Sequence, residues 1–249
     1  MLLHVPPESL FYPLSAPIPT LDRSTLPEQA AQSSTVIIRE WRRLLSLGPA
    51  RLVKAGTRLF GQASSARAIF LIESGLVKLS RTSNCGRERA LLLRSPGDLV
   101  GACGTLLRMP HLVSATAVTD CRLISLPVGR ALETFHTSAE AASFLAQQQM
   151  IDAIRISSLL MEARTLVAEQ RFFRFLLQLA VATNSVRSAD SRVSVRVPLS
   201  EAEIADLIGM NRSAFSRLKR VLIRNGYLLQ RDKNVYSFSR HLAAADIST

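Results

Sequence analysis

Cysteine is scarce in this chain, and its spacing offers nothing for metal binding. Only Cys85, Cys103 and Cys121 occur among 249 residues, with no pair in C-x-x-C spacing and no histidine at zinc-finger spacing. A structural zinc site or an iron–sulfur cluster would need ligands that these residues do not supply. We expect all three thiols to be reduced, buried packing residues of a cytoplasmic protein.

Long apolar runs and acidic residues are also few. No apolar run reaches the length of about 18 residues needed to cross a bilayer, and the first residues lack a basic segment followed by a clean apolar core. We therefore expect no secretion signal and no membrane partner. The 31 Lys and Arg outnumber 19 Asp and Glu, a net charge of +12 that favours an anionic partner, nucleic acid first.

The residue patterns of common enzymes are missing as well. We find no Ser/His/Asp order, no paired carboxylates in a setting that raises a pKa, no phosphate-binding loop and no metal-ligand spacing. The sequence therefore predicts a non-enzymatic protein. With 47% hydrophobic residues, the chain is long enough for two domains with their own cores.

The residue pattern changes twice within the N-terminal half of the chain. Residues 1–34 hold six of the eleven prolines, which predicts a flexible arm. Residues 35–47 have helical periodicity, and Gly48-Pro49 ends it. From there short apolar runs alternate with turn residues, as in an antiparallel sandwich or barrel. The expected strands are Arg51–Val53, Arg58–Phe60, Ala68–Ser74, Gly75–Arg81, Arg87–Leu93, Asp98–Val100, Ser114–Val118 and Cys121–Pro127.

Two helices are expected next, a short one over 128–135 and a long one over 139–163. The long one carries residues at alternating steps of three and four, the seam of a two-stranded coiled coil, which predicts a dimer. Packing of this helix on its own barrel is the alternative. The predicted seam consists of Phe144, Gln147, Ile151, Ile154, Ser158 and Met161.

The stretch over 198–226 reads as two short helices joined by a tight turn. Ser200 and Glu203 form a capping box at the start of the first helix, and Gly209 suits a left-handed turn at its end. Asn211 is the expected N-cap of the second helix, which Asn225-Gly226 terminates. A helix over 166–182 and strands over 192–197 and 227–238 would complete a winged helix-turn-helix.

The second helix of this motif has one basic side. Seven Lys and Arg stand between Met210 and Lys233, against one acid. A solvated amphipathic helix with no partner is the alternative interpretation. The caps, the turn and the one-sided charge together favour binding to double-stranded DNA. The residues predicted to contact DNA are Ser200, Arg212, Ser213, Ser216, Arg217, Arg220, Arg231 and Lys233.

Taken together, these segments resemble one superfamily of bacterial transcription factors, that of the cyclic AMP receptor protein and the fumarate/nitrate reduction regulator. The resemblance covers roughly residues 48–240. The motifs that carry it are Ala55-Gly56 with Leu59-Phe60-Gly61, the run from Phe70 to Gly75 with Val77-Lys78-Leu79, the Pro96-Gly97-Asp98 turn, and Ser114 to Val118.

The resemblance implies an α+β fold in which a cyclic-nucleotide-binding-like β-roll, or jelly roll, is followed by a long dimerisation helix and a winged helix-turn-helix. The implied domains are an arm over 1–34, a sensor roll with flanking helices over 35–135, a dimer helix over 136–164 and a DNA-binding domain over 165–249. It further implies a cytoplasmic homodimer on a palindromic operator, with RNA polymerase as a partner.

Cyclic-nucleotide-binding relatives hold the sugar phosphate with a Gly-Glu-Leu segment and a downstream Arg-Ser-Ala. Here the first segment reads Gly101-Ala102-Cys103, and Ser114-Ala115 follow Val113 in the second. Both charged residues are missing, and a buried phosphate without its arginine would be unpaired. Cyclic AMP binding in the family manner is therefore not expected. In cyclic AMP responders the dimer helix contributes hydroxyls to the base, and the resemblance places Ser157 or Ser158 near that position; ordinary packing of a seam serine is the alternative.

Other relatives sense redox state or gases. The N-terminal region contains no cysteine, which excludes an N-terminal cysteine cluster here. Haem-binding relatives use a His or Cys near the pocket, where Cys103 and His111 lie; we interpret these as a core thiol and an exposed loop histidine. We thus predict no cofactor, and the effector is open.

The recognition helix matches the family at both arginines, Arg212 and Arg217, which suit bidentate donation to guanine. Ser213 replaces the family's glutamate, so we expect the half-site to differ at that base pair. The rival hypothesis is a ligand- or redox-sensing module whose C-terminal domain docks a protein rather than DNA.

Overall fold

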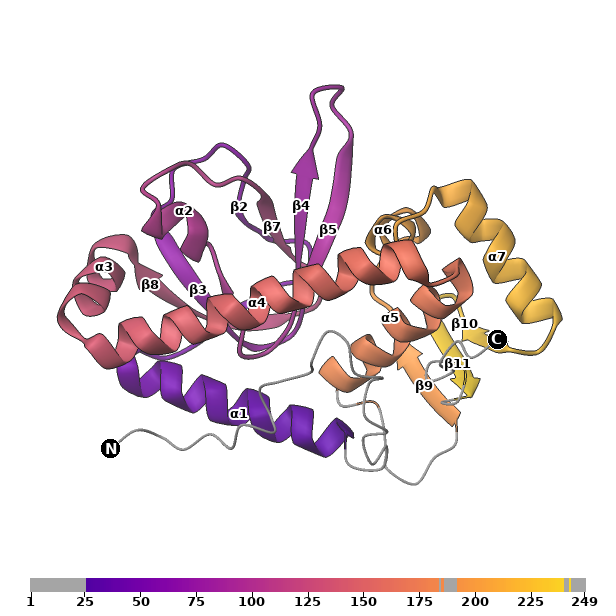
Figure 1. The fold of residues 1–249 in the computed structure, drawn as a ribbon, viewed down its shortest axis with the longest axis horizontal. Helices are drawn as coiled ribbons and strands as arrows, with labels where there is room; N and C mark the ends of the chain where they lie inside the picture. Colours follow the sequence, from indigo (N-terminus) through magenta and orange to yellow (C-terminus); the bar gives the residue numbers. More distant parts are fainter. Residues whose placement is uncertain (1–25, 184, 186–191, 240–241, 243–249) are drawn as a thin grey trace.

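The computed structural model describes residues 26–183, 185, 192–239 and 242. In it a β-roll and a smaller C-terminal domain lie side by side along one long helix, α4 (Ala139–Thr165) (Figure 1). The roll contains the strands of the N-terminal half, and the C-terminal domain contains the helix-turn-helix. This is the mixed α+β architecture that the sequence predicts.

Eight antiparallel strands form the roll as two four-stranded sheets, ordered β1-β8-β3-β6 and β2-β7-β4-β5. Small and β-branched side chains such as Ile72, Val77 and Ala115 fill the space between the sheets. The predicted strands agree with the observed ones to within two residues at each end. Their bounds are β1 Arg51–Val53, β2 Arg58–Phe60, β3 Ala68–Ser74, β4 Val77–Thr82, β5 Glu88–Arg94, β6 Leu99–Val100, β7 Ser114–Ala117 and β8 Cys121–Pro127.

Three helices cover the outer face of the first sheet: α1 (Leu26–Leu44), α3 (Val128–Thr137) and the N-terminal half of α4. Trp41 of α1 is completely buried there, and its ring meets that of Phe144 edge-on at 4.7 Å between centroids. A buried tryptophan of this kind excludes water from a large area and fixes α1 and α4 on the roll.

Helix α1 begins at Leu26, nine residues before the predicted start at residue 35, so the predicted arm over 1–34 is too long. Pro27 does not prevent this, because proline in the first turn of a helix has no hydrogen bond to lose. The proline-rich residues 1–25 lie outside the described residues.

The C-terminal domain packs α5 (Ala168–Ala182), α6 (Glu201–Leu207) and α7 (Arg212–Arg224) against a three-stranded sheet. The sheet order is β10-β11-β9, with β9 Arg192–Arg196, β10 Leu228–Asp232 and β11 Val235–Ser239. Phe172 lies at the centre, with ring centroids 5.0 Å from Phe215 of α7 and 6.1 Å from Tyr236 of β11. The winged helix-turn-helix expected from the sequence is thus formed.

The two domains meet where α6 lies along β5, an edge strand of the second sheet. Asp206 accepts the backbone N–H of Ala90 at 3.1 Å and a hydrogen bond from the Arg89 guanidinium at 2.5 Å. Lys78 of β4 reaches Glu203 of α6, also at 2.5 Å. Leu76 of the roll is buried within the core of the C-terminal domain, so polar and apolar contacts both join the domains.

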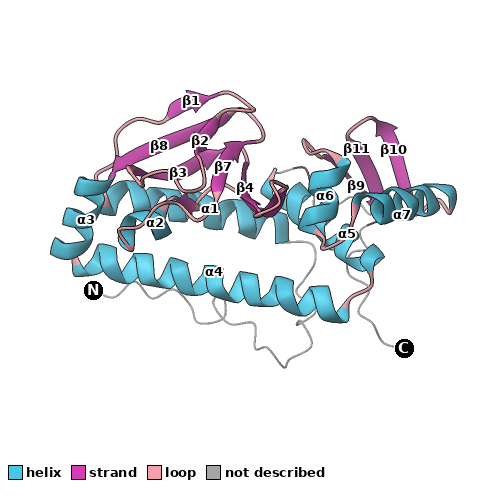
Figure 2. Cartoon of the chain, turned by 90° about the horizontal axis from the view of Figure 1, so that it is seen from above, coloured by secondary structure: helices cyan, strands magenta, loops and turns pink. Residues whose placement is uncertain are grey.

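Helix α4 turns one side toward the roll and the other outward, and no described element covers its outer side (Figure 2). The predicted seam is wrong at Phe144, which packs inward on Trp41. Of the other predicted seam residues, Gln147, Ile154 and Met161 are exposed, whereas Ile151 and Ser158 are half-buried, so the predicted seam does not follow the uncovered side of the helix. The outer stripe, as we call it, consists of Met150, Ala153, Ile154, Ser157, Leu160 and Met161.

Candidate nucleic-acid interface

Helix α6 begins as the sequence predicts. The Ser200 N–H donates to the Glu203 carboxylate at 2.8 Å, and the Glu203 N–H donates to the Ser200 hydroxyl at 3.3 Å. This reciprocal pair satisfies two backbone donors that a helix start leaves free. Gly209 follows the helix with φ of +70°, a conformation that glycine adopts without strain. The turn therefore brings the next helix across α6.

Helix α7 is capped by Asn211, whose side-chain oxygen accepts the Ala214 N–H at 2.8 Å. The Ser213 hydroxyl donates to the same oxygen, also at 2.8 Å. The helix ends at Arg224, followed by Gly226 with φ of +75°. Both predicted ends are confirmed, and Phe215 and Leu222 on its inner side are buried.

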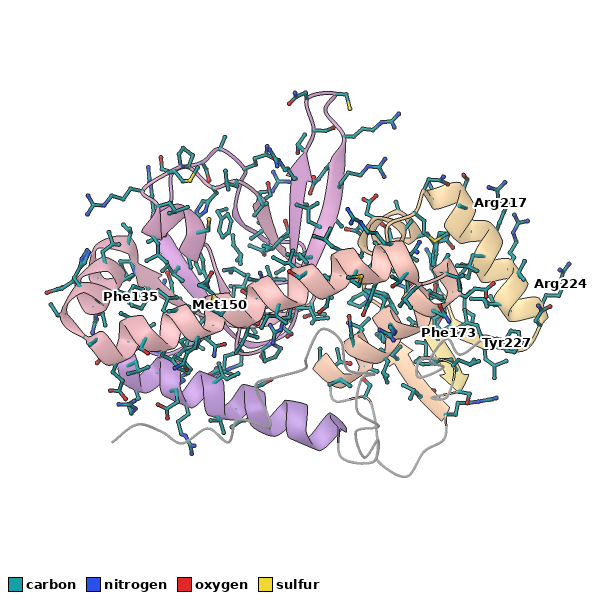
Figure 3. The ribbon with its side chains drawn as sticks, in the orientation of Figure 1. Phe135, Met150, Phe173, Arg217, Arg224 and Tyr227 are labelled. Carbon is teal, nitrogen blue, oxygen red and sulfur yellow. The ribbon has the colours of Figure 1, made fainter. Side chains whose placement is uncertain are left out.

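The outer side of α7 is basic and uncovered. Arg212, Arg217, Arg220 and Arg224 are all exposed, and none has a carboxylate partner among the residues that the structure describes. Figure 3 shows Arg217 and Arg224 projecting away from the domain. Exposed guanidinium groups without carboxylate partners on one helix face can donate both to phosphates and to the O6 and N7 of guanine.

Glu201 at the start of α6 ties this helix to α7. Its carboxylate accepts from the Ser216 hydroxyl at 2.7 Å and pairs with Lys219. The Lys219 ammonium and the Ser216 hydroxyl hold the pKa of Glu201 below its usual value. Ser216, predicted to contact DNA, therefore has its hydroxyl engaged between the helices. Local sequence patterns do not predict this bond, because its partners are fifteen residues apart.

The structure describes the side chain of one of the two basic residues predicted in the wing. Lys233 is exposed in the turn between β10 and β11, where its N–H donates to Asp232 at 2.7 Å. Its carbonyl accepts from the Gln230 amide at 2.9 Å. Arg231 belongs to β10, and its side chain lies outside the described part of the chain.

The predicted ligand-pocket residues lie partly in the roll and partly on α4. Gly101 (φ +88°) and Ala102 begin the short helix α2 (Ala102–Leu106), which the sequence did not suggest, and Ser114 and Ala115 are buried in β7. The Ser114 hydroxyl accepts the Gln62 N–H at 2.9 Å. Ser157, by contrast, is exposed on the outer stripe of α4.

Aromatic rings stand against α2. The ring of His111 stacks on Phe60 with centroids 3.8 Å apart, and a Cβ added to Gly101 would lie 3.4 Å from each ring. His111 is only 5% exposed, and burial lowers its pKa. It is therefore a core residue and not the exposed loop histidine that the sequence suggested.

The cysteines also differ from expectation. Cys121 is buried, but Cys85 and Cys103 are exposed. Cys85 stands in the turn of the β4–β5 hairpin, and Cys103 follows the buried Ala102 on α2, whose opposite side faces solvent. Among the described residues no group of three His, Cys, Asp or Glu side chains could hold a metal ion.

Comparison with known proteins agrees with this geometry. A model of the cyclic nucleotide-binding domain matches residues 50–138, and one of the Crp-like helix-turn-helix domain matches residues 170–237. A probable transcriptional activator of Rhizobium leguminosarum is 30% identical over 67% of this chain and 68% of its own length. The chain belongs to the CRP/FNR superfamily. This regulator is therefore a DNA-binding transcription factor and not an enzyme.

Two further relatives define how far the similarity reaches. The cyclic AMP receptor protein of Thermus thermophilus is 39% identical, but over 33% of the regulator and 38% of its own length. The c-di-GMP responsive global regulator CLP of Xanthomonas campestris shares the fold, with a TM-score of 0.65 and 23% identity over 80% of the regulator and 97% of that chain. No helix in the described ranges combines the length and apolarity required to cross a bilayer.

Proposed function

We propose that the regulator works as a cytoplasmic homodimer that reads a palindromic operator with two α7 helices and contacts RNA polymerase there. The observation that carries the proposal is the uncovered basic face of α7, in which Arg212 and Arg217 keep guanidinium groups without carboxylate partners. In this arrangement the two helices enter major grooves about 34–36 Å apart, one helical turn along the duplex.

The outer stripe of α4 supports pairing of two copies. Met150 and Leu160 are 65% and 62% exposed, and Ile154 and Met161 are about half exposed, at 44% and 56%. Four large apolar side chains on one uncovered helix face lose much of their contact with water if a second α4 lies against them. Ser157 would lie at the centre of that contact.

We further propose that the roll does not bind cyclic AMP in the family manner. Neither a carboxylate for the ribose nor an arginine for the phosphate stands at 101–103 or at 113–115. The rings of Phe60 and His111 lie close to Gly101. Haem ligation by His111 would require this stacked ring to leave its position. The effector, if the regulator has one, differs in chemistry from a cyclic nucleotide held by an arginine.

One experiment tests these proposals together. Purified regulator is mixed with fragments of the genome of its source, and bound fragments are recovered and sequenced, with and without cyclic AMP at about 1 mM, well above ordinary ligand affinities. We expect enrichment of a palindromic half-site pair that cyclic AMP leaves unchanged. Recovery of random fragments would contradict operator recognition, and enrichment that depends on cyclic AMP would contradict the pocket argument.

A further inference from the structure

The β4–β5 hairpin has one basic face and one mixed face. Successive residues of an extended chain point to opposite faces, so Arg89 of β5 shares a face with Arg87, which directly precedes β5 and whose carbonyl accepts the Ser83 N–H. Arg81 of β4 is paired directly opposite Arg89, and therefore shares this face too. These three arginines are all exposed, and we call them the hairpin arginines.

The hairpin's one acid lies on the other face. Glu88 accepts from the Ser80 hydroxyl at 2.6 Å and stands 3.7 Å from Arg58 and 4.0 Å from Lys78. It neutralises none of the hairpin arginines. Among the described residues Arg81 and Arg87 have no carboxylate partner, while Arg89 pairs with Asp206 of α6. Arg81 and Arg87 therefore keep positive charges that no described carboxylate neutralises.

This basic face opens toward the recognition helix. Arg89 and Leu91, one above the other on β5, line a cleft of about 600 Å³ whose opposite wall includes Asn211 and Ala214 of the first turn of α7. Arg171 of α5, which donates to the carbonyls of Ile208 and Leu166, and Asp206 of α6 also line the cleft. In Figure 3 the hairpin rises on the same side of the molecule as Arg217.

Helix-turn-helix proteins place the second helix in the major groove and cross the phosphate backbone with the first. Here β5 lies against that first helix, because Asp206 of α6 accepts the Ala90 N–H. The backbone strand that passes α6 and the start of α7 is therefore directed toward the hairpin. Arg81 and Arg87, two unneutralised cations on an exposed face, suit contact with neighbouring phosphates.

We propose that the hairpin arginines form a second DNA-binding surface, which holds the phosphates flanking the recognition helix. The surface belongs to the sensor domain, so both domains contact the duplex at once. The inference rests on the proposed mode of DNA binding by α7. The hairpin arginines contact phosphates alone, so they raise the affinity for DNA of any sequence without changing the base preference.

The test removes Arg81 and Arg87 and leaves Arg89, which holds the domains together. The R81A/R87A protein and the parent are titrated, by fluorescence anisotropy, onto a labelled duplex of arbitrary sequence about four helical turns long over a series of salt concentrations. The matched control, R51A/R130A, removes two exposed arginines from β1 and α3, on the other side of the roll. Circular dichroism and light scattering establish that all three proteins share fold and assembly state.

We expect the slope of log K against log salt to become shallower by nearly two in R81A/R87A, because each lost phosphate contact removes about 0.9. The control should match the parent, R81K/R87K should recover most of the slope, and the enriched operator sequence should be unchanged. Equal slopes for R81A/R87A and the control would overturn the proposal, as would tighter binding, which would mean that the hairpin obstructs DNA. Failure of the parent itself to bind would instead contradict the proposed function.

Discussion

Specificity at the residue scale rests on very few free side chains. On α7 the hydroxyls of Ser213 and Ser216 are already engaged, by Asn211 and Glu201 respectively, and Lys219 is paired with Glu201. In the proposed complex, the arginines are left to meet the bases. Bidentate donation from arginine distinguishes guanine from the other bases, so the regulator should favour sites with guanine at both contacted positions.

Replacement of Arg217 tests this directly. We expect R217A to lose about 1–3 kcal/mol of discrimination between the enriched operator and a version mutated at one base pair, because its guanidinium reads that pair. Competition mobility-shift assays at fixed salt measure the difference. R51A, a change on the distant β1, serves as control, and an unaltered preference in R217A would assign Arg217 to phosphate contact only.

A second substitution, also on α7, restores at position 213 the glutamate that is common in the family. We expect S213E to shift the preferred half-site toward a cytosine, since a carboxylate accepts from cytosine N4 and a serine bonded to Asn211 does not present such an acceptor. Selection from a random duplex library gives the preference of each protein. S213A, which lacks the hydroxyl but adds no charge, should retain the parent's half-site.

At the scale of the element, the stability of α7 depends on the cap at its first turn. Asn211 satisfies the first turn of α7 through one side-chain oxygen, and no other side chain among the described residues caps that turn. We expect N211A to lower the free energy of unfolding by about 1 kcal/mol, whereas N211D keeps an acceptor and should stay near the parent. Urea unfolding followed by circular dichroism compares the three. Equal losses in both variants would assign the effect to something other than the cap.

The outer stripe of α4 is tested by placing a charge on it. We expect L160D to be monomeric at micromolar concentration while the parent is dimeric, because a carboxylate in an apolar helix contact is costly to desolvate. Sedimentation equilibrium measures the mass. A163D adds the same charge at an exposed position about 120° around α4 from the centre of the outer stripe and should leave the assembly unchanged; a parent that is itself monomeric would remove the stripe's role.

Much of this element scale could be predicted from local chemistry. The caps at Ser200, Asn211 and Gly226 depend on residues close in sequence, and the structure confirms each of them. The sequence places the start of α1 too late, because the many prolines of residues 1–34 favour a flexible arm. A helix nevertheless tolerates a proline in its first turn, where Pro27 lies. Helix α2 was missed because five residues show no periodicity.

Side-chain environments set by tertiary contacts could not be predicted in this way. His111 is buried because it stacks on Phe60, fifty-one positions earlier, and Phe144 turns inward because Trp41 of α1 meets it. Neither partner is adjacent in sequence, so periodicity alone assigns the wrong face. The joining of Ser216 to Glu201 is a third case of the same kind.

At the scale of the whole molecule, salt bridges between the domains add to the apolar contact of Leu76. Burial alone would raise the pKa of Glu203, yet the Lys78 ammonium and the donors of Ser200 hold it below its usual value. A carboxylate with a lowered pKa in the folded state stabilises that state fully above its unfolded pKa of about 4.3, and this contribution is lost as the pH falls through the folded value.

We therefore expect the stability of the regulator to fall more steeply below pH of about 4.3 than that of E203Q, in which this carboxylate cannot titrate. Urea midpoints from neutral to acidic pH provide the measurement. E133Q on α3 removes an exposed carboxylate that has no ion partner among the described residues, and it should follow the parent. Parallel curves for E203Q and the parent would show that the domain contact does not respond to this group.

The pairing of Asp206 with the Ala90 N–H has a consequence for the solution behaviour of the protein. Strand β5 is a sheet edge, and a bare edge is a template on which other chains add strands. While α6 lies along it, that edge is closed to neighbours. Any state in which the C-terminal domain swings away would uncover a row of strand amides, so freedom of the DNA-binding domain and resistance to aggregation are opposed in this molecule.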